Sequence, residues 1–78
     1  MNYYRLALYA ILDAVDIYNQ GAKGRHKKHY HECKEFLFTN QLDQYLEYYD
    51  IKLLPETILA LVGEDIAPIK KELLYGEN

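Results

Sequence analysis

Residues 3–18 form the stretch that most limits how this chain can fold. Its apolar residues recur at alternating steps of four and three, the spacing that places side chains on one face of an α-helix. The members of this stripe are Tyr4, Leu8, Ile11, Val15 and Tyr18. Further apolar residues cover most of the remaining circumference, and a helix that is apolar nearly all round is surrounded by its neighbours. We therefore expect a central helix from Tyr3 to Tyr18, followed by a left-handed cap at Gly21.

Two helices are predicted in the middle of the chain, and each has an apolar stripe. The predicted bounds are residues 25–28 to 38 for the first helix and residues 41–49 for the second. Their inward stripes are, in order, Tyr30, Cys33, Phe36 and Leu37, and then Leu42, Tyr45, Leu46 and Tyr49. Thr39 or Asn40 is expected to cap the second of these helices, because short polar side chains accept hydrogen bonds from the first free N–H groups of a helix.

Two short helices are predicted in the last third of the chain. Pro55 suits the first position of one, because its φ is helical and no donor is needed there, and Gly63 closes that helix. Asp65 is expected to cap the other, over Ile66–Tyr75. Their inward residues are predicted to be Ile58, Leu59 and Val62, and then Ile66, Ile69, Leu73 and Leu74. No sustained two-residue alternation occurs. The sequence therefore predicts an all-α fold, a compact bundle of about five helices in a single domain over residues 1–78, with two longer N-terminal helices and three short C-terminal ones.

Cysteine content and the length of the apolar segments indicate in which cellular compartment the protein is found. Cys33 is the only cysteine, so no intramolecular disulfide forms, and a reducing compartment is favoured. The first residues lack the basic region and cleavage site of a secretory signal peptide. The apolar residues 6–18 contain Asp13 and Asp16 and are too short and too charged to span a membrane. We therefore expect a soluble, cytoplasmic protein without a membrane partner.

Positive charge is concentrated in one segment of a chain whose net charge is −3. Five of the nine lysines and arginines lie between Lys23 and Lys34. The candidates for contact with nucleic-acid phosphates are Lys23, Arg25, Lys27 and Lys28. A charged loop that keeps a tyrosine-rich protein soluble is an equally good interpretation. Residues 42–62 also have the order helix, turn, helix, but residues 55–62 offer no Arg, Lys, Asn or Gln to contact base edges.

All three histidines and the only cysteine fall in the same region. His26, His29 and Cys33 share one face of a helix, and the last two have a spacing that is common among zinc ligands. A structural zinc site normally has four protein ligands, and only three are present locally. Cys33 also belongs to the apolar stripe, where cysteine is a frequent core residue. We therefore predict no metal and no cofactor, with these three residues as weak metal candidates.

Sequence motifs of catalysis are absent. The chain has no glycine-rich phosphate loop, no nucleophile elbow and no HExxH motif. Asp13 and Asp16 stand on a largely apolar helix, where a carboxylate is costly unless it is paired or exposed. We expect exposure or an ion pair with Arg25, Lys28 or His29 rather than acid–base chemistry. The sequence therefore predicts that the protein is not an enzyme.

Tyrosines and acids at the end of the predicted third helix favour protein interaction. Tyr48 and Tyr49 are consecutive on a short helix, so both cannot face the core. An exposed tyrosine rimmed by acids has the composition of an interface hot spot. The predicted contacts are Tyr45, Glu47, Tyr48, Tyr49 and Asp50. We predict a helical interaction module that binds a protein partner or itself. The alternative is a small nucleic-acid-binding regulator that uses residues 23–28.

The order of four segments resembles a known group of proteins. Ala10 with Asp13 is followed by residues 33–38, 42–47 and 54–58, which read CKEFLF, LDQYLE and LPETI. This order looks like that of small helical proteins of tailed phages and prophages, over roughly residues 6–62. The resemblance implies an all-helical fold, a phage or mobile-element origin and a place in the host cytoplasm. Those proteins have no assigned activity, so it implies no reaction.

Overall fold

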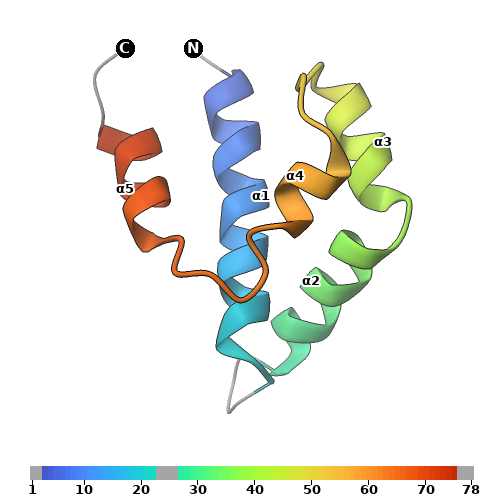
Figure 1. Ribbon diagram of the computed structural model, residues 1–78. Coiled ribbons are helices and arrows are strands. Elements are labelled where there is room, and N and C mark those ends of the chain that lie inside the picture. Colours follow the sequence, from blue (N-terminus) through green and yellow to red (C-terminus); the bar gives the residue numbers. More distant parts are fainter. Residues whose placement is uncertain (1–2, 23–26, 76–78) are drawn as a thin grey trace.

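The first helix, α1, is the element against which most of the others pack. The computed structural model describes residues 3–22 and 27–75, which contain five α-helices and no strand. Their bounds are α1 (Tyr3–Gln20), α2 (Lys27–Phe38), α3 (Gln41–Tyr48), α4 (Pro55–Leu59) and α5 (Ala67–Tyr75). Helix α1 contacts α2, α4 and α5 and runs through the middle of the molecule (Figure 1). The predicted all-α bundle of about five helices is confirmed, as is the central position of the first helix.

The core consists of apolar side chains from four helices and two connections. The buried members are Ala7, Ile11, Leu12, Val15, Leu37, Leu42, Leu46, Ile51, Ile58 and Ile66. Four of them lie on one side of α1. Within the predicted stripe, Leu8 and Tyr18 are only half-buried, and Tyr4 is 45% exposed. Tyr4 lies in the first turn of α1 and is exposed, so the stripe was wrong at this end.

An aromatic cluster joins the end of α1 to α2. Tyr18 stacks on Tyr30 with ring centroids 5.2 Å apart and packs at a tilt against Phe38 at the same distance. Leu37 is the buried residue of α2, whereas the other residues of its predicted stripe are half-buried. Gly21 ends the helix as expected, with a φ of 87° and an N–H that donates to the Tyr18 carbonyl. A positive φ carries no steric penalty for glycine.

Local hydrogen bonds fix both ends of α3. The Thr39 Oγ1 accepts a bond from the Gln41 N–H at 3.2 Å, whereas Asn40 makes no side-chain cap bond. Of the two predicted caps, Thr39 is therefore the residue whose side chain accepts a hydrogen bond at the start of α3. Beyond α3, the Ile51 N–H donates to the Leu46 carbonyl at 2.8 Å, and the chain then runs without regular structure through residues 51–54. Pro55 begins α4 as predicted.

The connection between α4 and α5 is anchored on α1 by one amide. Helix α4 ends at Leu59, earlier than predicted, and turns continue as far as Gly63. Asn19 Oδ1 accepts a bond from the Gly63 N–H at 2.8 Å, and its Nδ2 donates to the Leu61 and Glu64 carbonyls. The Asn19 amide thereby satisfies backbone groups of the turns that follow α4.

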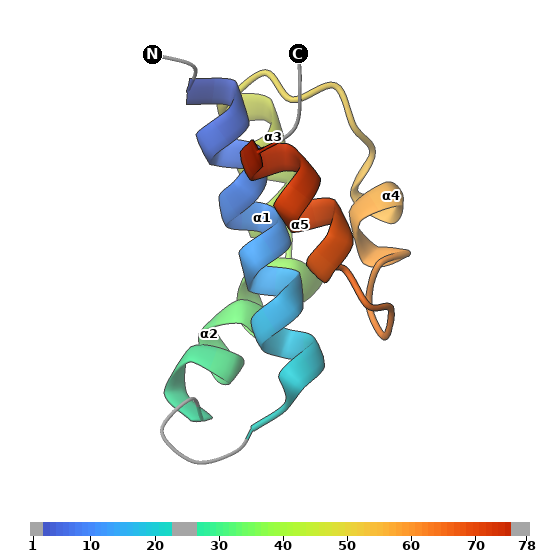
Figure 2. The same cartoon turned by 90° about the vertical axis from the view of Figure 1, so that its left-hand side faces the viewer.

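Helix α5 packs on the side of α1 opposite α3 (Figures 1 and 2). Asp65 Oδ1 accepts a bond from the Ala67 N–H at 3.2 Å, so the predicted cap is confirmed. None of the helix's residues is buried. The predicted inward residues Ile69 and Leu74 are 44% and 49% exposed, because α5 packs mainly against one neighbour, α1. No helix within the described residues is long and apolar enough to cross a bilayer.

Candidate interaction surface

Four of the five predicted contact residues lie together on the outside of the molecule. Glu47, Tyr48, Tyr49 and Asp50 occupy the last turn of α3 and the residues just after it, and all four are exposed. We call these four residues the α3 surface. Tyr48 is 81% exposed, while Tyr49 is 38% exposed although it was predicted to belong to the buried stripe. The predicted buried stripe was therefore wrong at Tyr49, and Tyr48 is the more outward of the two consecutive tyrosines.

A row of aromatic rings connects this surface to the interior. Phe36 of α2 meets Tyr45 edge to face with centroids 5.3 Å apart. The ring centroid of Tyr45 in turn lies 4.7 Å from that of Tyr49, and the Tyr49 centroid lies 4.8 Å from that of Tyr48. Because each ring packs against the next, Tyr48 has less rotational freedom to lose on binding than an isolated surface tyrosine.

Tyr45 is a structural residue of α3. Its side chain is half-buried, and its hydroxyl donates a hydrogen bond to the Ala7 carbonyl of α1 at 2.9 Å. Burial raises the pKa of the Tyr45 phenol, with a smaller contribution from Tyr49. The sequence placed Tyr45 both in the buried stripe and among the partner contacts. The structure confirms its inward role, and its hydroxyl is already engaged within the chain.

The acids of this region differ in how their charges are balanced. Asp50, with a φ of 55°, forms an ion pair with Lys52 at 2.7 Å, and both side chains are about 80% exposed. The hydrogen bond and charge of Asp50 raise the pKa of Lys52. Asp43 and Glu47 are exposed on α3, and no basic side chain of the described chain forms an ion pair with them.

A groove of about 450 Å³ lies beside the α3 surface. One wall comes from α3 and the turn before it, and the other comes from the residues that lead into α4. The lining residues are Asn40, Asp43, Gln44, Leu46, Glu47, Ile51, Leu53, Leu54 and Pro55. Sequence reasoning missed this groove, although the adjacent leucines Leu53 and Leu54 in a predicted turn were a sign of exposed apolar surface.

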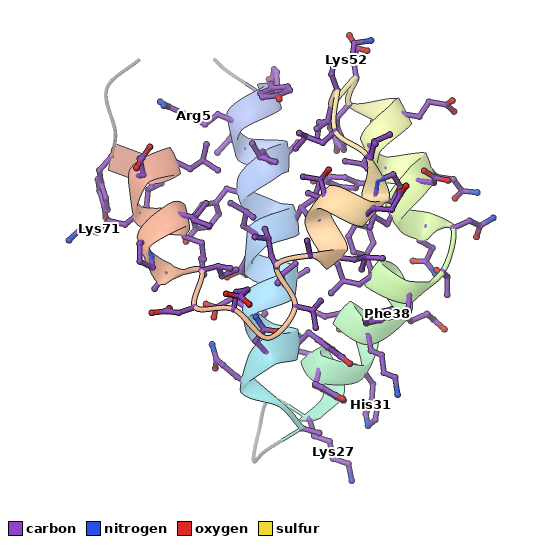
Figure 3. All side chains as sticks on the ribbon, in the orientation of Figure 1. Arg5, Lys27, His31, Phe38, Lys52 and Lys71 are labelled. Atoms are coloured by element: carbon purple, nitrogen blue, oxygen red, sulfur yellow. The ribbon has the colours of Figure 1, made fainter. Side chains whose placement is uncertain are left out.

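The described lysines of the basic segment lie at the other end of the molecule. Lys27 and Lys28 are exposed in the first turn of α2, whereas Lys23 and Arg25 fall outside the described residues. Lys27 projects from the end of the molecule opposite Lys52, which follows the α3 surface (Figure 3). The two regions that the sequence singled out are therefore separate surfaces.

The described residues of the weak metal candidate do not converge. His29 Nδ1 lies 3.5 Å from Glu32 Oε1, with both side chains exposed, and Cys33 is half-buried beside Ala10 and Ala14. Burial raises the pKa of the Cys33 thiol, with smaller contributions from Asp13 and Glu32. Within the part of the chain that the structure describes, no three His, Cys, Asp or Glu side chains form a group able to hold a metal. His26 lies outside that part.

The carboxylates of α1 have a partner that the sequence analysis did not identify. Lys70 Nζ lies 2.9 Å from Asp13 Oδ1 and 2.9 Å from Asp16 Oδ2. The expected ion pair is confirmed, but its cation comes from α5 rather than from Lys28 or His29, because α5 packs along this side of α1. The third predicted partner, Arg25, lies outside the described residues. Partial desolvation lowers the pKa of Lys70, but the two hydrogen bonds and the two negative charges outweigh it, so the net pKa is raised. The Nζ also lies 5.3 Å from the centre of the Tyr9 ring.

Comparisons of the chain with protein-family models, with curated proteins and with solved structures each give no match. The resemblance to small phage proteins therefore stays a prediction, and the functional argument depends on the geometry of the α3 surface.

Proposed function

We propose that this protein is a non-enzymatic interaction module that binds a protein partner, or a second copy of itself, through the α3 surface. The observation that carries the proposal is the position of Tyr48, which is 81% exposed and stands at the outer end of a row of packed rings. A large aromatic side chain in this position offers apolar area and a hydroxyl at low entropic cost.

The charges around Tyr48 support the same role. Glu47 and Asp50 flank it in sequence and are exposed. Rim charges of one sign raise the association rate with a partner of opposite sign and disfavour partners of the same sign. Because Lys52 pairs with Asp50, the acidic charge beside the aromatic anchor comes mainly from Glu47.

A non-enzymatic role is supported by the state of the paired carboxylates. Asp13 and Asp16 are the pair that acid–base chemistry would need, and each accepts a hydrogen bond from Lys70. Both carboxylates are therefore engaged in an ion pair that joins two helices. These residues therefore serve to attach α5 to α1.

The alternative function is nucleic-acid binding through the start of α2. The exposed Lys27 and Lys28 support it, because phosphate contacts come from such side chains. The acidic α3 surface would be repelled by the same phosphates, so the two functions need different faces of the molecule.

One experiment separates these functions. The double variant Tyr48→Ser, Glu47→Lys is compared with wild type and with Tyr75→Ser, which removes a 75% exposed tyrosine from α5. Sedimentation velocity measures self-association, and capture from a lysate of the source cells measures partner binding. We expect the double variant to lose association and Tyr75→Ser to keep it, with equal helical circular dichroism.

Association that survives in the double variant would exclude the α3 surface as the site. A labelled DNA duplex is titrated in parallel at low and physiological salt. Binding that weakens steeply with salt and disappears in Lys27→Gln, Lys28→Gln would favour the nucleic-acid alternative.

A further inference from the structure

The groove beside the α3 surface has an apolar wall that the chain itself leaves uncovered. Leu54 is 64% exposed and Leu53 is 36% exposed, and both line the groove. The buried residues Leu46 and Ile51 also line it, so the apolar lining is continuous with the core. An apolar side chain placed here would remove the two leucines from water, and such removal is the main favourable contribution to association.

The opposite wall carries negative charge without a cation. Asp43 and Glu47 are four residues apart on α3 and both line the groove, so they lie on the same side of the helix. Like charges in this arrangement destabilise a helix. No ion pair within the described chain relieves them, in contrast to Asp50, which Lys52 neutralises. The groove is therefore complementary to a cation as well as to an apolar group.

We propose that this groove binds a short segment of a partner protein in which one or two apolar side chains are flanked by lysine or arginine. The apolar side chain packs between the leucine wall and α3, and the basic side chains pair with Asp43 and Glu47. This inference rests on the proposed function, because it names the partner chemistry for the groove that adjoins the α3 surface. The volume of about 450 Å³ suits a few side chains of such a segment.

Synthetic peptides test this chemistry directly. The probe is a fluorescein-labelled peptide of twelve residues with two leucines four positions apart and four arginines, and its binding is followed by fluorescence anisotropy. One control peptide has glutamate in place of arginine, and another has serine in place of leucine. A fourth peptide reproduces residues 21–31 of this chain, GAKGRHKKHYH, and stands for a second copy as the occupant.

Matched variants of the protein assign the binding to the groove. Asp43→Asn with Glu47→Gln removes the charge of one wall, and Leu54→Ser removes apolar area from the other. Glu56→Gln is the control, because Glu56 is an exposed acid outside the groove. We expect each groove variant to weaken binding of the arginine–leucine peptide by about tenfold or more. Glu56→Gln should bind as wild type does. All substituted positions are exposed, and unchanged circular dichroism and thermal midpoints verify the fold.

Three results would overturn the proposal. If the serine peptide binds as tightly as the leucine peptide, the binding is only the general attraction between an acidic protein and a basic peptide. Groove variants that bind like wild type would place the site elsewhere, and preferential binding of the chain's own peptide would make a second copy the occupant. The proposed function is judged separately with Tyr48→Ser, since Tyr48 does not line the groove. If Tyr48→Ser loses partner association while the groove variants keep it, only the groove assignment fails. If Tyr48→Ser and the groove variants all keep partner association, both the groove assignment and the proposed function fail.

Discussion

At the scale of single residues, two polar side chains hold segments that are far apart in sequence. Asn19 uses both atoms of its amide to fix the turn after α4, and Tyr45 bonds α3 to α1. Within the described residues, no buried side-chain nitrogen or oxygen lacks a hydrogen-bond partner. Since an unpaired polar group in the interior is costly, such side chains determine how neighbouring helices can approach one another.

Removal of one hydroxyl tests this role. Tyr45→Phe keeps the ring contacts with Phe36 and Tyr49 but removes the hydrogen bond to the Ala7 carbonyl. We expect the free energy of unfolding to fall by about 1 kcal/mol, the usual net contribution of such a bond. Urea unfolding followed by circular dichroism measures it. The control Tyr48→Phe changes an exposed hydroxyl and should shift the value by less than about 0.5 kcal/mol. An equal loss in both variants would show that the bond to α1 contributes nothing specific.

At the scale of elements, the sequence predicted most helix bounds better than which side of each helix faces inward, although α4 ends earlier than predicted. Gly21, Pro55 and Asp65 act through backbone geometry and local hydrogen bonds, which depend on neighbours in sequence. The inward face of α5 was wrong at Ile69 and Leu74, because the direction from which α1 approaches decides it and spacing alone does not contain that direction.

For the candidate surface, too, the sequence predicted one feature and missed another. The exposure of Tyr48 follows from its adjacency to Tyr49 on a helix, so the sequence was sufficient to predict it. The groove depends on the placement of Leu53 and Leu54 against α3. That placement results from the path of the chain after Asp50, whose backbone adopts a left-handed conformation that is uncommon for a residue with a side chain.

Helix α5 is predicted to depend on one ion-pair network. It has no buried residue, and Lys70, with a side chain that is only 15% exposed, joins it to Asp13 and Asp16. Lys70→Met keeps much of the side-chain volume and leaves two neighbouring carboxylates without their cation. We expect the free energy of unfolding to fall by about 1–2 kcal/mol, between the values for exposed and fully buried pairs. Amide hydrogen exchange should quicken first in α5. Lys71→Met, at an exposed position, is the matched control.

The pH dependence of this network has a definite sign. The pKa of Lys70 is raised above its ordinary value of 10.5. A raised pKa means that the stabilisation is fully present below the unfolded pKa and disappears as pH rises through the folded pKa. The stability difference between wild type and Lys70→Met should therefore stay constant from pH 7 to about pH 10 and shrink above it. A difference that already shrinks between pH 7 and pH 9 would contradict the assignment to this ammonium.

At the scale of the whole molecule, both candidate surfaces depend on one small core. The acidic α3 surface and the lysines of α2 lie at opposite ends, and the helices that carry them share one core with α1. A chain of 78 residues has a free energy of unfolding of only about 4–12 kcal/mol. Loss of one central side chain is therefore expected to affect both surfaces together.

Ile11 is the residue on which that expectation is tested, because it lies near the middle of α1 and is fully buried. Ile11→Val should lower the free energy of unfolding by about 1 kcal/mol, and Ile11→Ala by about 3 kcal/mol or more, since a cavity adds to the lost transfer energy. Leu6→Ala, at a 54% exposed position of the same helix, should change it by less than about 1 kcal/mol. Urea unfolding followed by far-UV circular dichroism and by tyrosine fluorescence gives these values. Coincident transitions by the two probes would show that α1 joins the helices into one cooperative unit. If the tyrosine signal of Ile11→Ala changed at lower urea than the helical signal, the chain would not unfold as one cooperative unit, and the expectation that both surfaces depend on α1 would be wrong.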